Sequence, residues 1–311
     1  MNLHEHPEEF HELIALTAQE KHISESAVER DYEIVRALRR LADSEYADSC
    51  VFKGGTSLSK CYPGSIERFS EDIDLTFYQT DGLSNKQIER RLKAIEKTMT
   101  DGAETAPVLS ERNDRNKSIY FWHRHEDSRI KLEIGSSVRP EPFSRRSLKT
   151  YIQEYLEAHD FAAEAVEFGL TAVELNVLNI ERTFLDKVMS VKRHAICGTL
   201  TEKVRHIYDV TRLFPMPEIQ AFLRNTDELK RLVSLTKNTD SVYLEKRNIP
   251  AEYDPTGPYD FEAWRGHLNG TIQSIYEHLH EDLLYTDEKQ DFSAAVRTLA
   301  DIGEIFRFIG E

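Results

Sequence analysis

Long hydrophobic runs are missing from this 311-residue sequence, and no apolar stretch approaches the ~18 residues of a membrane-spanning helix. Cysteine is scarce too: Cys50, Cys61 and Cys197 form no CxxC pair, which excludes a disulfide framework and a zinc ribbon and is typical of a reducing compartment. Glycine and proline number 13 and 10 against 40% hydrophobic residues, so the chain is neither collagenous nor of low complexity. We therefore expect a soluble globular protein with a sizeable core.

Positive charge is in deficit, because 40 Lys and Arg stand against 55 Asp and Glu, a formal net charge of −15. This balance argues against a surface that coats nucleic acid non-specifically, but it leaves room for a local basic groove. The first residues, MNLHEHPEEFHELI, lack a basic segment followed by an apolar one. We therefore expect no signal peptide, no membrane association and a cytoplasmic location.

Sequence periodicity predicts an α+β protein of two domains: a mixed α/β part, residues 1–145, and a mostly helical part, residues 146–311. In the first part we expect helices at 26–43 and 85–100 and strands at 51–52, 72–77, 119–122 and 130–134. In the second part we expect helices near 150–158, 181–196, 201–214, 217–224, 262–280 and 288–309, and a long loop at 238–261. The capping-box spacing of Ser26 and Glu29 predicts the start of the first helix.

The segment most informative about chemistry is the turn Gly54-Gly55-Thr56-Ser57, which is followed after a short interval by Asp72-Ile73-Asp74. Residues i and i+2 of a strand share one face about 7 Å apart, so Asp72 and Asp74 can converge on hard divalent cations. The exposed backbone N–H groups of the glycine turn and the Ser57 hydroxyl can hold a triphosphate at a helix N-terminus. Together they predict metal-dependent phosphoryl transfer.

A third acid, Glu133, lies between the apolar Leu132 and Ile134 on a later strand, points opposite to them and is the candidate to complete the metal site. The alternative interpretation is structural, with the paired aspartates as an acidic strand edge, the glycines as a tight turn and Glu133 as an outward edge-strand acid. The joint occurrence of turn, paired acids and third acid in this order favours the catalytic interpretation.

Five segments of the sequence resemble the AbiEii/AbiGii toxin family of the DNA-polymerase-β-like nucleotidyltransferase superfamily. Phe52–Lys60 followed by Phe69–Leu75 resembles motif I of that family, and Val28–Tyr32 is similar to the signature that precedes it. Thr183–Val188 resembles the family's acid-lysine helix motif, and Arg205–Val210 resembles its arginine-to-aspartate motif. The resemblance implies a polymerase-β-like nucleotidyltransferase lobe with a mixed sheet, followed by a helical lobe.

The resemblance also implies roles for individual residues. The implied nucleotide-binding residues are Gly54, Gly55, Thr56, Ser57 and Lys187, and the implied magnesium ligands are Asp72, Asp74 and Glu133. Asp72, Asp74, Lys187 and Asp209 are the implied catalytic residues, with Asp209 as an active-site acid. Without the resemblance, Lys187 would be interpreted as a solvated helical lysine, and Asp209 as the partner of a local ion pair with Arg205.

The implied activity is Mg²⁺-dependent transfer of a nucleoside monophosphate from an NTP to an acceptor. In this expectation Lys187 neutralises the leaving group, Asp209 assists as a base, tRNA is the acceptor, and the enzyme is the toxin of a bacterial toxin–antitoxin or phage-defence pair with a separately encoded antitoxin. Two alternatives stay open. One is the same chemistry on a protein or small-molecule acceptor, which the acidic composition favours, and the other is a non-catalytic interaction module with structural acids.

Overall fold

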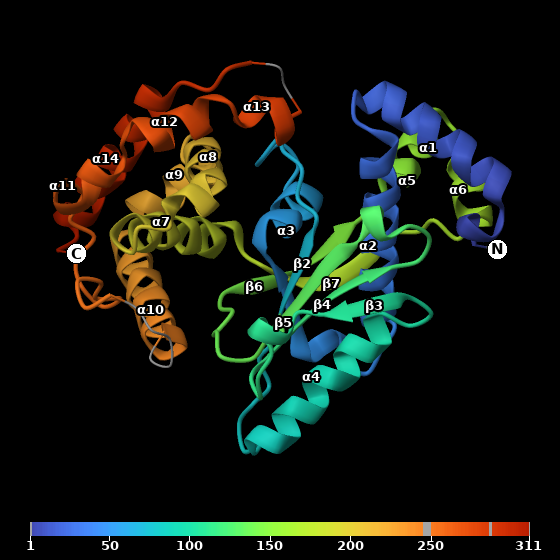
Figure 1. The fold of residues 1–311 in the computed structure, drawn as a ribbon, viewed down its shortest axis with the longest axis horizontal. Helices are drawn as coiled ribbons and strands as arrows, with labels where there is room; N and C mark the ends of the chain where they lie inside the picture. Colours follow the sequence, from blue (N-terminus) through green and yellow to red (C-terminus); the bar gives the residue numbers. More distant parts are fainter. Residues whose placement is uncertain (1, 245–249, 286–287, 311) are drawn as a thin grey trace. The chain divides into compact units, whose positions relative to one another are not determined.

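The computed structural model describes residues 2–244, 250–285 and 288–310, which form two compact units (Figure 1). Unit 1 comprises residues 1–61, 69–136 and 143–178, and unit 2 comprises residues 62–68, 137–142 and 179–311. Within the described ranges no helix is long and apolar enough to cross a membrane.

Unit 1 is built on a mixed sheet that has seven strands in the described part of the chain, in the order β3-β4-β5-β2-β1-β7-β6. The strands are β1 (Cys50–Lys53), β2 (Asp72–Phe77), β3 (Glu104–Pro107), β4 (Asn116–Trp122), β5 (Ile130–Gly135), β6 (Phe143–Leu148) and β7 (Val173–Leu178). The pairs β2–β5 and β1–β7 are parallel, and the other neighbouring pairs are antiparallel. The expected α+β class with a mixed sheet is confirmed.

The helices of unit 1 are α1 (Pro7–Lys21), α2 (Glu25–Ala42), α3 (Gly54–Cys61), α4 (Asn85–Met99), α5 (Tyr151–Ala158) and α6 (Ala162–Glu167), with short 3₁₀ turns η1 (Leu3–Glu5), η2 (Ala47–Ser49), η3 (Leu109–Glu111) and η4 (Glu126–Ser128). Three of these helices, α2, α4 and α5, begin at a Ser or Thr whose side chain accepts a backbone N–H of the first turn. The expected cap of α2 at Ser26 is wrong, because the cap is Ser24, two residues earlier, whose hydroxyl accepts the Ala27 N–H.

Along β2, buried apolar residues alternate with residues that point to the opposite face of the sheet. Ile73, Leu75 and Phe77 are buried, and so are Ile130, Leu132 and Ile134 on the neighbouring β5. Helices α2 and α4 pack against each other, and α4 packs against β4 and β5 whereas α2 packs against β7 (Figure 1). The residues between the apolar ones on β2 and β5 point to the opposite face, where the expected acids lie.

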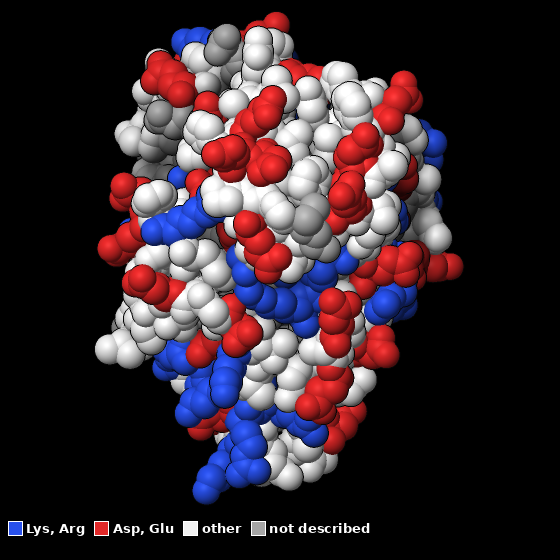
Figure 2. Space-filling view, turned by 90° about the vertical axis from the view of Figure 1, so that its right-hand side faces the viewer, with Lys and Arg blue, Asp and Glu red and all other residues white. Residues whose placement is uncertain are grey.

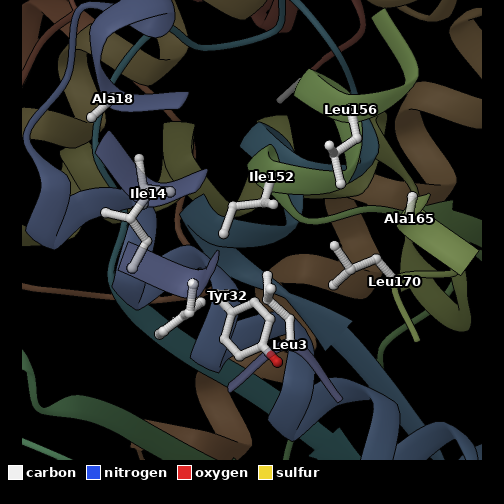
Figure 3. Packing of buried hydrophobic residues seen from close by; sticks show 10 residues of the cluster. Leu3, Ile14, Ala18, Tyr32, Ile152, Leu156, Ala165 and Leu170 are labelled. Atoms are coloured by element: carbon white, nitrogen blue, oxygen red, sulfur yellow. The ribbon is translucent and has the colours of Figure 1, made fainter. Parts of the chain in front are cut away.

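A second apolar cluster joins the N-terminal segment to α2, α5 and α6 (Figure 3). Its buried side chains are Leu3, Phe10, Ile14, Ala18, Val28, Tyr32, Ile152, Leu156, Ala165 and Leu170. The cluster draws on residues more than a hundred positions apart, so α1 and α6, which periodicity did not identify, acquire their stability from tertiary packing.

Unit 2 is helical in its described part. Its helices are α7 (Ile180–Ile196), α8 (Val204–Leu213), α9 (Pro217–Arg224), α10 (Thr226–Leu244), α11 (Phe261–Trp264), α12 (Gly270–Glu277), α13 (Leu279–Asp282) and α14 (Phe292–Phe308), with 3₁₀ turns η5 (Leu200–Lys203) and η6 (Arg265–His267). Helix α8 packs against α7, α12 and α14, so it lies at the centre of this unit.

Three expectations for the second half of the chain are wrong in part. The helix expected at 262–280 is divided into α11, η6, α12 and α13, where Gly266 and Gly270 interrupt the pattern. Residues 238–244 of the expected loop continue α10, and residues 245–249 lie outside the described residues. Strands β6 and β7 extend the sheet to Leu178, so the compact units separate there along the main chain, beyond the expected boundary at 145/146.

A buried ion pair joins three helices of unit 1. The Lys60 ammonium of α3 lies 2.6 Å from Asp31 Oδ1 of α2, and both side chains are almost inaccessible. The Tyr151 N–H at the start of α5 donates to Asp31 Oδ2 at 2.6 Å, and Lys60 Nζ lies 4.0 Å from the Tyr151 ring centroid. Asp31 lies in the segment Val28–Tyr32, which is similar to the signature that precedes motif I, and its observed contacts give that segment a structural role.

We expect Asp31→Ala to lower the free energy of unfolding by about 3 kcal/mol, because the substitution leaves Lys60 buried without an anion. Urea unfolding followed by circular dichroism measures this loss. The double variant Asp31→Ala/Lys60→Met removes both charges and should lose less than the two single losses added together. Additive losses would show that the two charges are not coupled.

Candidate active site

The turn between β1 and α3 requires glycine at position 54. Gly54 has a φ of +88°, and a Cβ atom placed there would lie 2.2 Å from Asp74 Oδ2. An L-residue would therefore suffer both backbone strain and a collision with the carboxylate. The absence of a side chain allows Asp74 to pack directly against the first residue of α3, where the helix dipole favours negative charge.

The hydroxyl groups of the turn tie α3 to its surroundings. Thr56 Oγ1 donates to the Asp72 carbonyl at 2.5 Å and lies 3.0 Å from Ser70 Oγ. Ser57 Oγ donates to the Gly54 carbonyl at 2.9 Å, and both side chains are buried. These bonds fix the start of α3 relative to the start of β2, so the expected nucleotide-binding turn and the first expected metal ligand form one local unit.

The register of β2 with β5 places the expected acids on one face of the sheet. In this parallel pair Asp74 is the Cα partner of Glu133, and Asp72 is the Cα partner of Lys131. Residues two apart on a strand share a face, and neighbouring strands lie ≈ 4.8 Å apart, so these four side chains form a compact array. Lys53 on β1 is the Cα partner of Asp74 on its other side.

Glu133 is held by a lysine of its own strand. Lys131 Nζ lies 2.6 Å from Glu133 Oε1 and 2.8 Å from Glu111 Oε2 at the end of η3. Burial lowers the pKa of Lys131, but the hydrogen bonds to the two glutamates outweigh burial and raise that pKa above its usual value. The lysine therefore stays charged and compensates part of the negative charge on this face.

The donor set fits a hard divalent cation, because Asp72, Asp74 and Glu133 supply carboxylate oxygens from two adjacent strands. As the side chains lie, the residues the structure describes contain no group of three or more Asp, Glu, His or Cys gathered for metal binding. One of the three acids, Glu133, is paired with Lys131 and is therefore not gathered with the two aspartates.

Lys187 and Asp209 meet in unit 2, together with a residue that sequence reasoning missed. Arg68 binds Asp209 through two parallel bonds, Nε–Oδ1 at 2.6 Å and Nη2–Oδ2 at 2.8 Å, and Lys187 Nζ lies 3.0 Å from Asp209 Oδ2. Asp209 is fully buried. Burial raises its pKa, but the adjacent Arg68 and Lys187 outweigh burial and lower the pKa to about 2.

These contacts correct two structural interpretations of the sequence. Lys187 is not a solvated lysine, because it is buried on α7 against Asp209 of α8. The ion-pair partners of Asp209 are Arg68 and Lys187, rather than Arg205 one helical turn away. Arg68 lies 141 residues before Asp209, so helical spacing could not reveal the pair. Lys131 carried a usable signal, because it shares a strand face with Glu133.

Comparison with known proteins supplies the family. The family model described as nucleotidyl transferase AbiEii toxin, type IV TA system, matches residues 36–298. Among solved structures, the nucleotidyltransferase toxin MenT4 of Mycobacterium tuberculosis is similar over 95% of this chain and 98% of its own, with 16% identity and a TM-score of 0.50. JHP933 of Helicobacter pylori is similar over 92% of each chain, with 18% identity and a TM-score of 0.41. No curated protein matches the sequence.

We expect Gly54→Ala to destabilise unit 1 more than Gly82→Ala. Both glycines have positive φ, +88° and +73°, so both substitutions incur backbone strain of about 1 kcal/mol. Only at Gly54 does the new methyl group collide with a carboxylate, since a Cβ at Gly82 meets nothing within 4 Å. Urea unfolding of the two variants gives the difference, and equal losses would contradict the close approach of Asp74.

The ion pairs of Asp209 predict a specific pH dependence of stability. Because the folded-state pKa is lowered from 3.8 to about 2, the stabilisation by ionised Asp209 is fully present above pH 4 and is lost as pH falls toward 2. The free-energy difference between wild type and Asp209→Asn should therefore be constant from pH 7 to pH 5 and should shrink below pH 4. Urea titrations at pH 7, 5, 4 and 3 measure it, and a difference that does not change with pH would contradict the lowered pKa.

Proposed function

We propose that this chain, which belongs to the AbiEii family of nucleotidyltransferase toxins, transfers a nucleoside monophosphate from an NTP to tRNA and uses Mg²⁺. Family membership makes the chain a nucleotidyltransferase whose substrate is an NTP. The observation that carries the proposal for this site is the β2–β5 register, which gathers Asp72, Asp74 and Glu133 on one face beside the glycine turn.

The carboxylates fit the cation that nucleotidyltransferases generally use. Asp72 and Asp74 would hold one Mg²⁺, and Glu133 would join one of them in holding a second. Bound Mg²⁺ would supply Lewis-acid stabilisation of charge on the phosphate oxygens. The residues of this chain would contribute by fixing the positions of those carboxylates, through the Thr56 bond to the Asp72 carbonyl and the contact of Asp74 with Gly54.

In the proposed reaction an acceptor hydroxyl oxygen attacks the α-phosphorus of the NTP. The new oxygen–phosphorus bond forms, the bond from the α-phosphorus to the bridging oxygen breaks, the hydroxyl proton leaves to solvent, and pyrophosphate departs. The backbone N–H groups at the start of α3 would bind the phosphates, since this eight-residue helix presents its N-terminus at the glycine turn. The Ser57 hydroxyl would join them only by giving up its bond to the Gly54 carbonyl.

Lys187 would neutralise charge on the triphosphate, and we propose a positioning role for Asp209 in place of the expected role as a base. A carboxylate with a pKa of about 2 binds a proton poorly at neutral pH. Both of its oxygens already accept bonds from Arg68 or Lys187. Burial lowers the pKa of Lys187 and Asp209 opposes that shift, so Asp209 would favour the ammonium form and hold it in place, as a support for the group that meets the substrate.

A basic surface on unit 1 supports an anionic polymer as acceptor. Figure 2 looks onto the right-hand side of Figure 1, and it shows Lys and Arg side chains across the middle and the lower part of this face, with Asp and Glu side chains among them. On helix α2, Arg36, Arg39 and Arg40 line a pocket of about 340 Å³ together with two acids, Glu5 and Asp43. Such a concentration of cations in a chain of net charge −15 is suited to a phosphate backbone.

The biological setting follows the family. A type IV toxin–antitoxin family implies an antitoxin as partner. We further propose that the pair acts in phage defence, and an arrest of growth when this chain is produced without the antitoxin would support the toxin role. Loss of that arrest in an Asp74→Asn strain would attribute it to the site.

The test of the activity incubates the purified protein with total tRNA and each α-³²P-labelled NTP in the presence of Mg²⁺. We expect label in tRNA, and we expect Asp74→Asn to reduce the rate by at least about a hundredfold, because the substitution removes a charged ligand. Asp81→Asn is the matched control, since Asp81 is an exposed aspartate of unit 1 in the turn after β2. Activity of this control should equal that of wild type.

The fate of the label separates the proposed acceptor from the alternative. Label in protein or in a small molecule, with tRNA unlabelled, would overturn tRNA as acceptor and retain the nucleotidyltransferase chemistry. Label in tRNA that persists in Asp74→Asn would overturn the assignment of the site. A requirement for added Mg²⁺, abolished by EDTA, would support the proposed cofactor.

A further inference from the structure

Lys131 lies at the centre of the acidic face of unit 1. Its Cα is the partner of Asp72 across the β2–β5 pair, and its ammonium bridges Glu133 at 2.6 Å and Glu111 at 2.8 Å. The side chain is mostly buried, with 17% of its area exposed, whereas those of Glu133 and Glu111 are 35% and 40% exposed. One cation of the protein thus has two carboxylate partners, one of which is a proposed metal ligand.

The bridge creates a direct competition for Glu133. A carboxylate oxygen that accepts a bond from an ammonium group cannot at the same time direct the same lone pairs to a divalent cation. A lysine near the site also repels an incoming cation. When Glu133 turns away, Lys131 can keep its ion pair with Glu111 and does not have to move into solvent.

We propose that Lys131 is a positioning residue that holds Glu133 before a divalent cation binds and is retained by Glu111 when Glu133 becomes a metal ligand. This inference rests on the proposed metal site. Strand β5 holds the backbone of Lys131 between β2 and β4, so the exchange needs a change in side-chain rotamers only. The partial exposure of both glutamates keeps the exchange accessible to solvent.

Substitutions of Lys131 and of Glu111 should change the affinity for Mn²⁺ in opposite directions. Lys131→Met keeps the length of the side chain and removes the competing charge, so it should tighten Mn²⁺ binding by on the order of tenfold. Glu111→Gln removes the alternative anionic partner, so Lys131 keeps its ion pair with Glu133. This variant should weaken Mn²⁺ binding several-fold. Electron paramagnetic resonance measures free Mn²⁺ during titration of the protein, independently of any catalytic turnover.

A double-mutant cycle separates the exchange from simple electrostatics. If Glu111 acts through Lys131, the effect of Glu111→Gln should disappear in the Lys131→Met background. If Glu111 only adds negative charge, the effect should persist unchanged there, which would overturn the proposal. Lys93→Met is the matched control for loss of one lysine, since Lys93 pairs with Glu89 on α4, and it should leave Mn²⁺ affinity unchanged.

The same titrations distinguish failure of this inference from failure of the metal site. If wild type binds Mn²⁺ and Asp74→Asn does not, the site stands, and an unchanged affinity in Lys131→Met then overturns only the role of Lys131. If neither wild type nor Lys131→Met binds Mn²⁺, the proposed metal site itself fails, and the inference fails with it. Far-ultraviolet circular dichroism of each variant confirms that the fold is retained.

Discussion

The gathering of negative charge on one face of the unit 1 sheet is the constraint on which the rest of that unit depends. Asp72 and Asp74 on β2 and Glu133 on β5 share a face, where like charges repel in the absence of compensation. The compensation is local: Lys131 pairs with Glu133, and Asp74 packs against the start of α3. A register slip of one residue between β2 and β5 would turn these acids into the core, so the apolar alternation and the site specify each other.

Unit 2 uses the same principle in a more buried form. Asp209 has no exposed surface, and it is stable there because a bidentate arginine and a lysine surround it. Removal of either cation leaves the carboxylate with fewer partners in a low dielectric. Asp72 follows Arg68 by only four positions, so one short segment supplies a partner for Asp209 in unit 2 and the first acid of unit 1.

Periodicity and motif order were sufficient for the parts of the structure that local sequence determines. The strands around Asp72 and Glu133, the helix at 85–100 and the turn that begins at Gly54 are all found near the expected positions. Strands β6 and β7 were missed, because β6 is an edge strand whose residues Arg145 and Arg146 are exposed and lack apolar alternation. Strand β7 was missed although Val173, Leu175 and Val177 alternate with Glu174 and Asn176, because this alternation spans only six residues between two helical segments.

The site residues also divide into those that local sequence predicts and those that only the tertiary structure reveals. Spacing placed the acids on one face, since i and i+2 positions on a strand are a local property, and the resemblance supplied Lys187 and Asp209. Neither could reveal Arg68, whose partner is distant in the sequence. Neither could assign protonation, because the low pKa of Asp209 depends on two cations brought in by the fold. A motif therefore names the groups at such a site, but whether a given carboxylate binds a metal, accepts a proton or supports a neighbour depends on the charges that tertiary structure places beside it.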